Sequence, residues 1–279
     1  MIPETRLIFF GNAEFSKIIL EKLVETGYVP QVLICSPDKP VGRRHLITPP
    51  LVKQFVHERQ LKTQVLQPGN TNELKAFKEE LRSAYPEVFI VASYPMIIPQ
   101  EILAIPTSGT IGVHPSLLPK YRGPAPIQYA ILDDESETGV TLFLMDEKVD
   151  HGPVLASRGL EFSILNFQFS NLRQKLAELG AELLIETLPK FVERKITPVP
   201  QDESQATYTK KFTTQDGFVD LEKDDPQVIF RKVKALNLEP GVWTIKNGKR
   251  TKILEAGIDR NGKLLLRKIQ IEGQKPKSI

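Results

Sequence analysis

Residues 6–35 follow a strand–helix–strand pattern, and this pattern constrains the fold more than any other feature of the chain. "RLIFF" (6–10) and "QVLIC" (31–35) are short apolar runs of the kind found in strands buried on both faces. Between them, "FSKIILEKLVET" places apolar residues at helical spacing, and Gly27 stands where a helix cap belongs. A helix joining two nearby strands favours parallel pairing, so we expect an α/β domain built on a parallel sheet.

Later segments extend the same architecture. Apolar runs predict strands at 88–92, 110–114 and 138–145, and helical spacing predicts a long helix at 171–188. The turn after the first strand, "GNAEFS", holds one glycine where a dinucleotide-binding loop needs three. We therefore expect a Rossmann-like domain with a parallel-sheet core and without a dinucleotide cofactor.

The pattern changes after residue 206. Asp225 and Pro226 stand at the start of a predicted helix. Asn-Gly pairs at 247–248 and 261–262 predict hairpins in which both turn residues have positive φ. We expect this region to form a small, OB-like β-barrel with one helix. The predicted boundaries are a larger domain over 1–189, a proline-containing linker over 190–206 and the β-rich domain over 207–279.

Charge is distributed unevenly along the chain. The net charge is +3, but residues 1–204 carry 21 Lys+Arg against 25 Asp+Glu, whereas residues 205–279 carry 16 against 9. A basic C-terminal region favours a polyanionic partner, above all a nucleic acid. The alternative is that a small domain is basic by chance.

The single cysteine excludes an intrachain disulfide. Cys35 ends an apolar run, so we expect it to be a buried core thiol. The sequence has no apolar stretch long enough to span a bilayer, and its start does not resemble a signal peptide. We expect a cytoplasmic protein with no membrane partner.

The most unusual segment is "TIGVHPSLLPKYRGPAPIQ", residues 110–128, in which four prolines surround one histidine. In a strand, alternate residues share a face, which places Thr110, Gly112 and His114 together. They stand at the C-terminal end of a predicted parallel strand, where open α/β sheets bind ligands. The prolines restrict φ in the following loop and suit it to grip a flat ligand.

Two carboxylates follow a later strand. "MDEKVDHGPVL" offers Asp146 and Asp150, and a histidine paired with a carboxylate is the usual unit for moving a proton near neutral pH. A single histidine at a strand end is nevertheless more often structural than catalytic. His45, in a basic loop, and His57, on a predicted helix, are expected to be structural. The histidines show no metal-ligand spacing, so we predict no metal.

"HPSLLPKYRGPAPIQ", followed by "MDEKVDHGP", resembles the folate-dependent formyltransferases. "LIFFGNAEFS" resembles that family's opening strand and turn, and "SPDKPVGRRHLITPPLVK" resembles its basic loop. "ATYTKKFTTQDGFVDL" and "VKALNLEPGVW" resemble the C-terminal domain of the members that formylate methionyl-tRNA. The resemblance extends over nearly the whole chain.

This resemblance implies a donor, 10-formyltetrahydrofolate, and an acceptor, the α-amine of methionine on initiator tRNA, in translation initiation. It implies catalysis by the larger domain and tRNA binding by the C-terminal domain. We also expect a monomer. In the family, an Asn-x-His pair on the strand and an Asp in the later turn perform the chemistry. Our hypothesis is that Asp150 orients His114, which stabilises the oxyanion and carries the proton. The matching positions are His114 and Asp150 for catalysis, Ser116, Leu117, Leu118 and Pro119 for folate binding, and Arg43 for the tRNA acceptor end.

The chain departs from the family at Gly112, where an asparagine is expected to donate to the developing oxyanion. Loss of one such donor typically costs about 2.7–4 kcal/mol. A neighbour such as Asn12, or a water, could compensate; the acceptor geometry could differ; or the chain could bind without catalysis. We favour compensation, because His114, Asp150 and the folate-binding segment are all present.

Three rival functions are open. A sugar-amine N-formyltransferase shares the core and the donor, but the basic C-terminal region and the "PVGRR" loop argue against it. A glycinamide ribonucleotide formyltransferase is expected to have a glycine-rich phosphate loop after the first strand and no basic second domain. A non-catalytic folate- or tRNA-binding homologue is supported by Gly112 alone.

Overall fold

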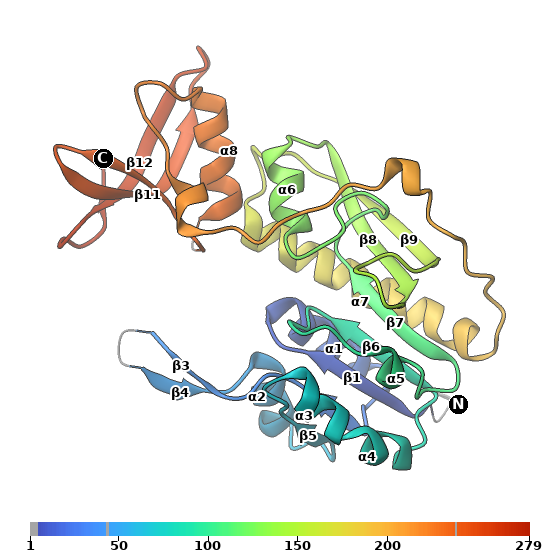
Figure 1. Cartoon of the computed structure of the whole chain (residues 1–279). Coiled ribbons are helices and arrows are strands. Elements are labelled where there is room, and N and C mark those ends of the chain that lie inside the picture. The colour runs from blue at the N-terminus through green and yellow to red at the C-terminus, as the bar shows by residue number, and fades with distance from the viewer. Residues whose placement is uncertain (1–4, 43–44, 238) are drawn as a thin grey trace. The chain divides into compact units, whose positions relative to one another are not determined.

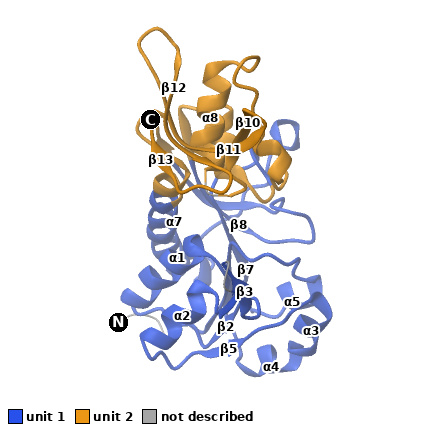
Figure 2. Cartoon of the chain, turned by 90° about the vertical axis from the view of Figure 1, so that its left-hand side faces the viewer, with its two compact units in different colours: residues 1–122, 139–159, 174–207 blue, residues 123–138, 160–173, 208–279 orange. Residues whose placement is uncertain are grey.

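A computed structural model describes residues 5–42, 45–237 and 239–279 (Figure 1). The chain divides into two compact units, shown in blue and orange in Figure 2. They do not follow one another along the sequence, because two early segments group with the C-terminal residues. The first unit holds residues 1–122, 139–159 and 174–207, and the second holds residues 123–138, 160–173 and 208–279.

A seven-stranded sheet with the order β5-β2-β1-β6-β7-β8-β9 forms the centre of the first unit. The five strands from β5 to β7 pair in parallel, as the strand–helix–strand pattern predicts, whereas β8 pairs with β7 antiparallel. The strands are β1 (Leu7–Gly11), β2 (Val32–Ile34), β5 (Gln64–Leu66), β6 (Val88–Ala92), β7 (Gly109–His114), β8 (Glu137–Leu144) and β9 (Val154–Glu161).

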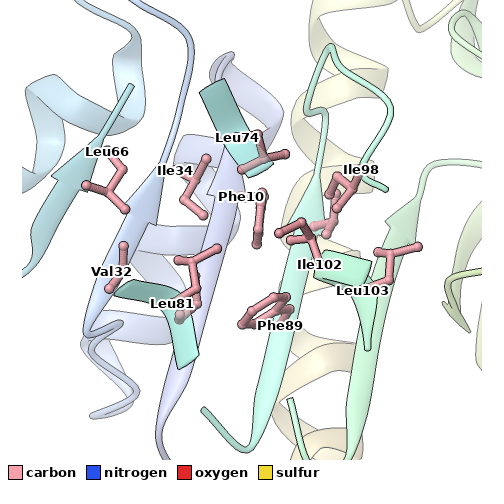
Figure 3. Packing of buried hydrophobic residues seen from close by; sticks show 12 residues of the cluster. Phe10, Val32, Ile34, Leu66, Leu74, Leu81, Phe89, Ile98, Ile102 and Leu103 are labelled. Carbon is pink, nitrogen blue, oxygen red and sulfur yellow. The ribbon is translucent and has the colours of Figure 1, made fainter. Parts of the chain in front are cut away.

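Short helices bury one face of this sheet. Phe10 and Phe89 on the sheet belong to the same buried cluster as Leu74 of α3, Leu81 of α4 and Ile102 of α5 (Figure 3). Burying such side chains supplies about 1.5–3 kcal/mol each. The helices of this unit are α1 (Glu14–Glu25), α2 (Leu51–Glu58), α3 (Thr71–Ala76), α4 (Lys78–Ser83), α5 (Gln100–Leu103) and most of α7 (Phe169–Val192), whose residues up to Arg173 belong to the second unit.

The long helix α7 packs against the opposite face. A Cβ built on Gly180 of α7 lies 3.2 Å from a methyl of Val113 and 3.2 Å from a methyl of Val140, so this glycine permits a close approach to β7 and β8. Because side chains alternate along a strand, His114 faces away from α7. The helix ends at Val192 and so extends into the segment predicted as a linker.

The basic loop forms an antiparallel hairpin, β3 (Lys39–Val41) and β4 (Leu46–Thr48), with Val41, Leu46 and Ile47 exposed. The sequence had predicted only a loop here. Arg43, predicted to contact tRNA, lies outside the described residues. His57 lies on α2, as expected.

The second unit contains α6 (Pro126–Leu132), α8 (Pro226–Leu236) and an antiparallel sheet with the strand order β10-β11-β12-β13. Tyr129 of α6 stacks on Phe212 with ring centroids 5.1 Å apart. Asp225 caps α8 by accepting from the backbone N–H of Gln227, as predicted. The strands are β10 (Val242–Lys246), β11 (Lys249–Ile258), β12 (Leu264–Ile271) and β13 (Lys277–Ser278), and among the described residues they pair as an open row, not as a closed barrel.

The two predicted Asn-Gly hairpins differ. Asn247 and Gly248 have φ of 50° and 71°, as the two-residue turn requires. At the second turn Gly262 has φ of 78°, but Asn261 does not have positive φ, so that part of the prediction is wrong. The Asp259 side chain accepts from the backbone N–H groups of Asn261 and Lys263, and this longer turn needs positive φ only at the glycine.

Within the described ranges, no helix combines the length and apolar character that crossing a membrane would demand.

Candidate active site

His114 ends β7 and is buried, with a side chain that is 7% exposed. Its Nε2 lies 2.9 Å from the carbonyl oxygen of Tyr121. A carbonyl oxygen only accepts, so Nε2 carries the proton and donates to it. The other ring nitrogen, Nδ1, lies 3.5 Å from Oδ2 of Asp150. This contact is an ion pair whenever Nδ1 is also protonated.

Asp150 lies in the turn that follows β8, and its side chain is 19% exposed. Its φ of 48° is in the left-handed region that residues other than glycine rarely occupy. Strands β7 and β8 pair antiparallel, so β8 ends beside the first half of β7, and the turn that follows runs back along β7 until Asp150 reaches His114. The structure thus places the two predicted catalytic residues together, while their roles stay a prediction.

The segment 116–119 follows His114 and is held in place from β8. Thr141 on β8 donates to the Ser116 carbonyl oxygen over 2.7 Å and accepts from the Leu118 N–H over 3.0 Å. The Ser116 hydroxyl is buried and donates to the Lys120 carbonyl, so this side chain holds the loop together. Leu117, Leu118 and Pro119 are half-buried, which leaves apolar surface beside His114.

Gly112 lies directly opposite Phe143 in the β7–β8 register. A Cβ built on Gly112 would overlap the Phe143 ring. Phe143 is 2% exposed, so this ring is part of the closely packed interior. The position at which the resembling family carries an amide is therefore filled by an aromatic ring from the next strand.

Asn12 does not replace that amide. It follows β1, and its Oδ1 accepts from the backbone N–H of Ser36, which follows β2. Strand β2 lies on the opposite side of β1 from β6 and β7. The Asn12 side chain is thus engaged with the segment that follows β2, so compensation from this residue is not supported.

Sequence reasoning missed a polar network around the Asp150 turn. Arg122, whose side chain is 0% exposed, donates to Gln201 and also forms two hydrogen bonds with the carboxylate of Glu203. This guanidinium holds the pKa of the Glu203 carboxyl below its ordinary value. Gln201 and Glu203 belong to the predicted linker, whose composition gave no sign of such contacts.

Asp146, the other carboxylate of this segment, pairs with a different histidine. Its Oδ2 lies 2.6 Å from Nδ1 of His151, and Nε2 of His151 lies 3.6 Å from Oε1 of Glu203. Sequence reasoning did not single out His151. Among the described residues, no group of three or more His, Cys, Asp or Glu side chains is arranged to hold a metal ion.

The second unit carries a candidate nucleic-acid surface on its first hairpin. Arg250 of β11 stacks over the Trp243 ring of β10 at 4.3 Å from the centroid. Exposed lysines on this hairpin provide positive charge for phosphates, namely Lys246, Lys249 and Lys252. Lys210 and Lys211, earlier in the same unit, are exposed as well.

Comparison with known proteins agrees with the resemblance seen in the sequence. A family model described as "Formyl transferase" matches residues 5–188, and one described as "Formyl transferase, C-terminal domain" matches residues 211–264. Methionyl-tRNA formyltransferase of Caldicellulosiruptor saccharolyticus is 41% identical over 253 residues, which cover 90% of this chain and 79% of that enzyme.

Solved structures share the fold at low identity. HypX from Aquifex aeolicus, in complex with tetrahydrofolic acid, superposes with a TM-score of 0.67 at 20% identity and covers 98% of this chain and 45% of that one. Methionyl-tRNA formyltransferase from Clostridium thermocellum superposes with a TM-score of 0.62 at 17% identity, covering 96% of this chain and 98% of that one. Two proteins with different names thus match about equally well, so the fold alone does not select the acceptor.

Proposed function

The chain belongs to the formyl transferase family, and on this premise we propose that it transfers the formyl group of 10-formyltetrahydrofolate to the α-amine of methionine on initiator tRNA. The observation that carries the proposal is the 41% identity to a methionyl-tRNA formyltransferase across 90% of the chain. The approach of His114 to Asp150 at the C-terminal end of β7 supplies a pair suited to the reaction.

The residues beside His114 fit the folate donor. The segment 116–119 is fixed by Thr141 before any ligand binds, and its half-buried apolar side chains suit a flat ring. Leu118 and Pro119 would hold this group. When bound, the folate supplies the formyl group that is transferred.

The reaction requires two contributions from the protein: removal of a proton and stabilisation of negative charge. The attacking amine must lose a proton, and negative charge develops on the formyl oxygen. Nε2 of His114 already carries a proton, so Nδ1 is the nitrogen that takes one up, and the resulting positive charge stabilises the developing negative charge. Asp150, 3.5 Å from Nδ1, holds the imidazole in position and stabilises its protonated form. The hydrogen bond from His114 to the Tyr121 carbonyl fixes the ring orientation.

The basic C-terminal region supports a tRNA acceptor. Residues 205–279 carry 16 Lys+Arg against 9 Asp+Glu, and the exposed lysines of the β10–β11 hairpin can contact phosphates. A nucleotide sugar needs far fewer positive charges, and the end of β1 and the turn after it hold a single glycine, Gly11, where a phosphate loop needs several. We also propose that the protein acts as a monomer in the cytoplasm, where translation occurs.

Formyl transfer to a panel of acceptors tests this function. We expect product with methionyl initiator tRNA, and none with deacylated tRNA or with a nucleotide-linked amino sugar. The affinity for tRNA should fall by roughly 0.7–0.9 log units per log unit of salt for each phosphate neutralised. Transfer to the amino sugar, or an affinity independent of salt, would contradict the proposal.

A second candidate rests on Gly112. Because Phe143 fills the space above it, no side chain there can donate to an oxyanion. A binding protein that holds folate and tRNA without turnover would show this departure. Saturable binding of both ligands with no formylated product would favour it.

A further inference from the structure

We propose that Gln201 is a positioning residue that holds Asp150 against His114; the inference rests on the proposed function. Gln201 lies 51 residues beyond Asp150 in sequence, in the segment predicted as a linker. All the residues in this argument belong to the first compact unit.

The Gln201 amide spans the Asp150 turn. Its Nε2 donates to the carbonyl oxygen of Asp150 over 3.0 Å and to that of Gly152 over 2.7 Å. One amide group has two N–H donors, and both are used here. The amide therefore ties together the two ends of a three-residue turn through its backbone.

Arg122 fixes which way this amide points. The Gln201 Oε1 accepts from Nε of Arg122 over 3.1 Å and from Nη2 over 2.8 Å. A guanidinium only donates, so the amide oxygen must face it and the NH2 group must face the turn. Arg122 is itself 0% exposed and anchored by two hydrogen bonds to Glu203, so the support is rigid.

The turn needs such support at Asp150. Gly152 is fixed by close packing, since a Cβ built on it would lie 1.7 Å from the Leu144 carbonyl oxygen. Asp150 instead adopts a φ of 48°, which a residue with a side chain rarely occupies. Gln201 holds this conformation, and the conformation directs the carboxylate to within 3.5 Å of Nδ1 of His114.

Gln201→Glu separates the two functions of the amide. The carboxylate still accepts from Arg122, but it cannot donate to the two carbonyl oxygens and repels them. Gln205→Glu is the matched control: Gln205 lies on the same segment and donates to Asp202 over 2.7 Å, away from the Asp150 turn. Gln201→Met, of similar length and uncharged, is the second variant should Gln201→Glu fail to fold.

We expect kcat for methionyl-tRNA formylation to fall about 10- to 100-fold in Gln201→Glu, because displacement of a reacting group by about 1 Å costs up to ~10² in rate. KM for both substrates should stay unchanged, and Gln205→Glu should match the wild type. Unchanged kcat in Gln201→Glu, a rise in KM alone, or an equal loss in the control would each overturn the inference.

A spectroscopic measurement separates this inference from the proposed function. We expect the ¹⁵N resonance of Nδ1 of His114 to move in Gln201→Glu, because the nearby carboxylate has moved, and to stay in place in Gln205→Glu. If the wild type does not formylate, but the resonance still differs between the wild type and Gln201→Glu, the proposed function is overturned and the positioning role stands. An active wild type with no shift in Gln201→Glu would overturn the positioning alone.

Discussion

Two histidine–aspartate pairs lie among the described residues of the first unit, and they differ both in the distance between their side chains and in their exposure to solvent. His151 and Asp146 approach to 2.6 Å, yet their side chains are 29% and 37% exposed. His114 and Asp150 are 3.5 Å apart, with side chains that are 7% and 19% exposed. The closer pair is the more solvated one.

The difference teaches that the shortest pair need not be the reactive one. Water screens an exposed ion pair, whose contribution is commonly about 0–1 kcal/mol. A charge interaction near a buried group is screened much less, so a longer contact can have the larger effect. His114 also lies at the end of β7 beside the half-buried segment 116–119, a place that His151 does not share.

The largest effect should come from replacing the two histidines, one at a time, with glutamine. His114→Gln should lower the rate of formyl transfer by roughly 10²–10⁴-fold, because the proton acceptor is lost. His151→Gln should lower it by less than about fivefold, in keeping with an exposed pair. Steady-state formylation of methionyl-tRNA by the two variants measures both, and equal losses would erase the distinction between the pairs.

Replacing the two aspartates should give the same contrast between the pairs, with a smaller difference in the rate of formyl transfer. Asp150→Asn keeps the shape of the turn but removes the charge beside His114, so transfer should slow by roughly 10²-fold or more. Asp146→Asn should leave the rate nearly unchanged. The same assay reports both variants, and a larger loss in Asp146→Asn would assign the catalytic role to the exposed pair.

Much of this arrangement could be predicted from local sequence. Apolar runs located the strands, and the local pattern placed His114 at a strand end and both Asp146 and Asp150 in a turn after a later strand, whereas only the resemblance to the family selects Asp150. Gln201 could not be predicted, because its contacts depend on the path of an irregular segment. The ring over Gly112 depends on the register of an antiparallel pair, β7 and β8, which local pattern does not specify.

Because the Phe143 ring lies over Gly112, position 112 of β7 should be sensitive to any increase in side-chain volume. Gly112→Ala should lower the free energy of unfolding by about 1–3 kcal/mol, because the added methyl overlaps the buried Phe143 ring. The penalty should shrink when Phe143→Leu is present, since the smaller side chain leaves room. Denaturant unfolding of the four proteins in this cycle measures the coupling, and additive effects would mean that the ring moves aside freely.

The smallest effect should be a change in stability at low pH, caused by Glu203, which lies beside His151 of the exposed pair. Arg122 lowers the pKa of Glu203 in the folded protein, so Glu203 contributes stability above its unfolded pKa and loses it as pH falls through the folded value. Glu203→Gln should therefore flatten the decline of the unfolding midpoint below about pH 5. Thermal unfolding across this range checks it, and an unchanged slope would argue against the Arg122–Glu203 contact.

The central claim is that His114 and Asp150 support formyl transfer in a chain with no side chain at Gly112. The most direct test is a single turnover of the unaltered protein, in excess over methionyl initiator tRNA and saturated with 10-formyltetrahydrofolate. The account predicts conversion of the bound tRNA to formylmethionyl-tRNA in one kinetic phase. Tight binding of both substrates without product would contradict it and identify a binding protein that lacks the chemistry.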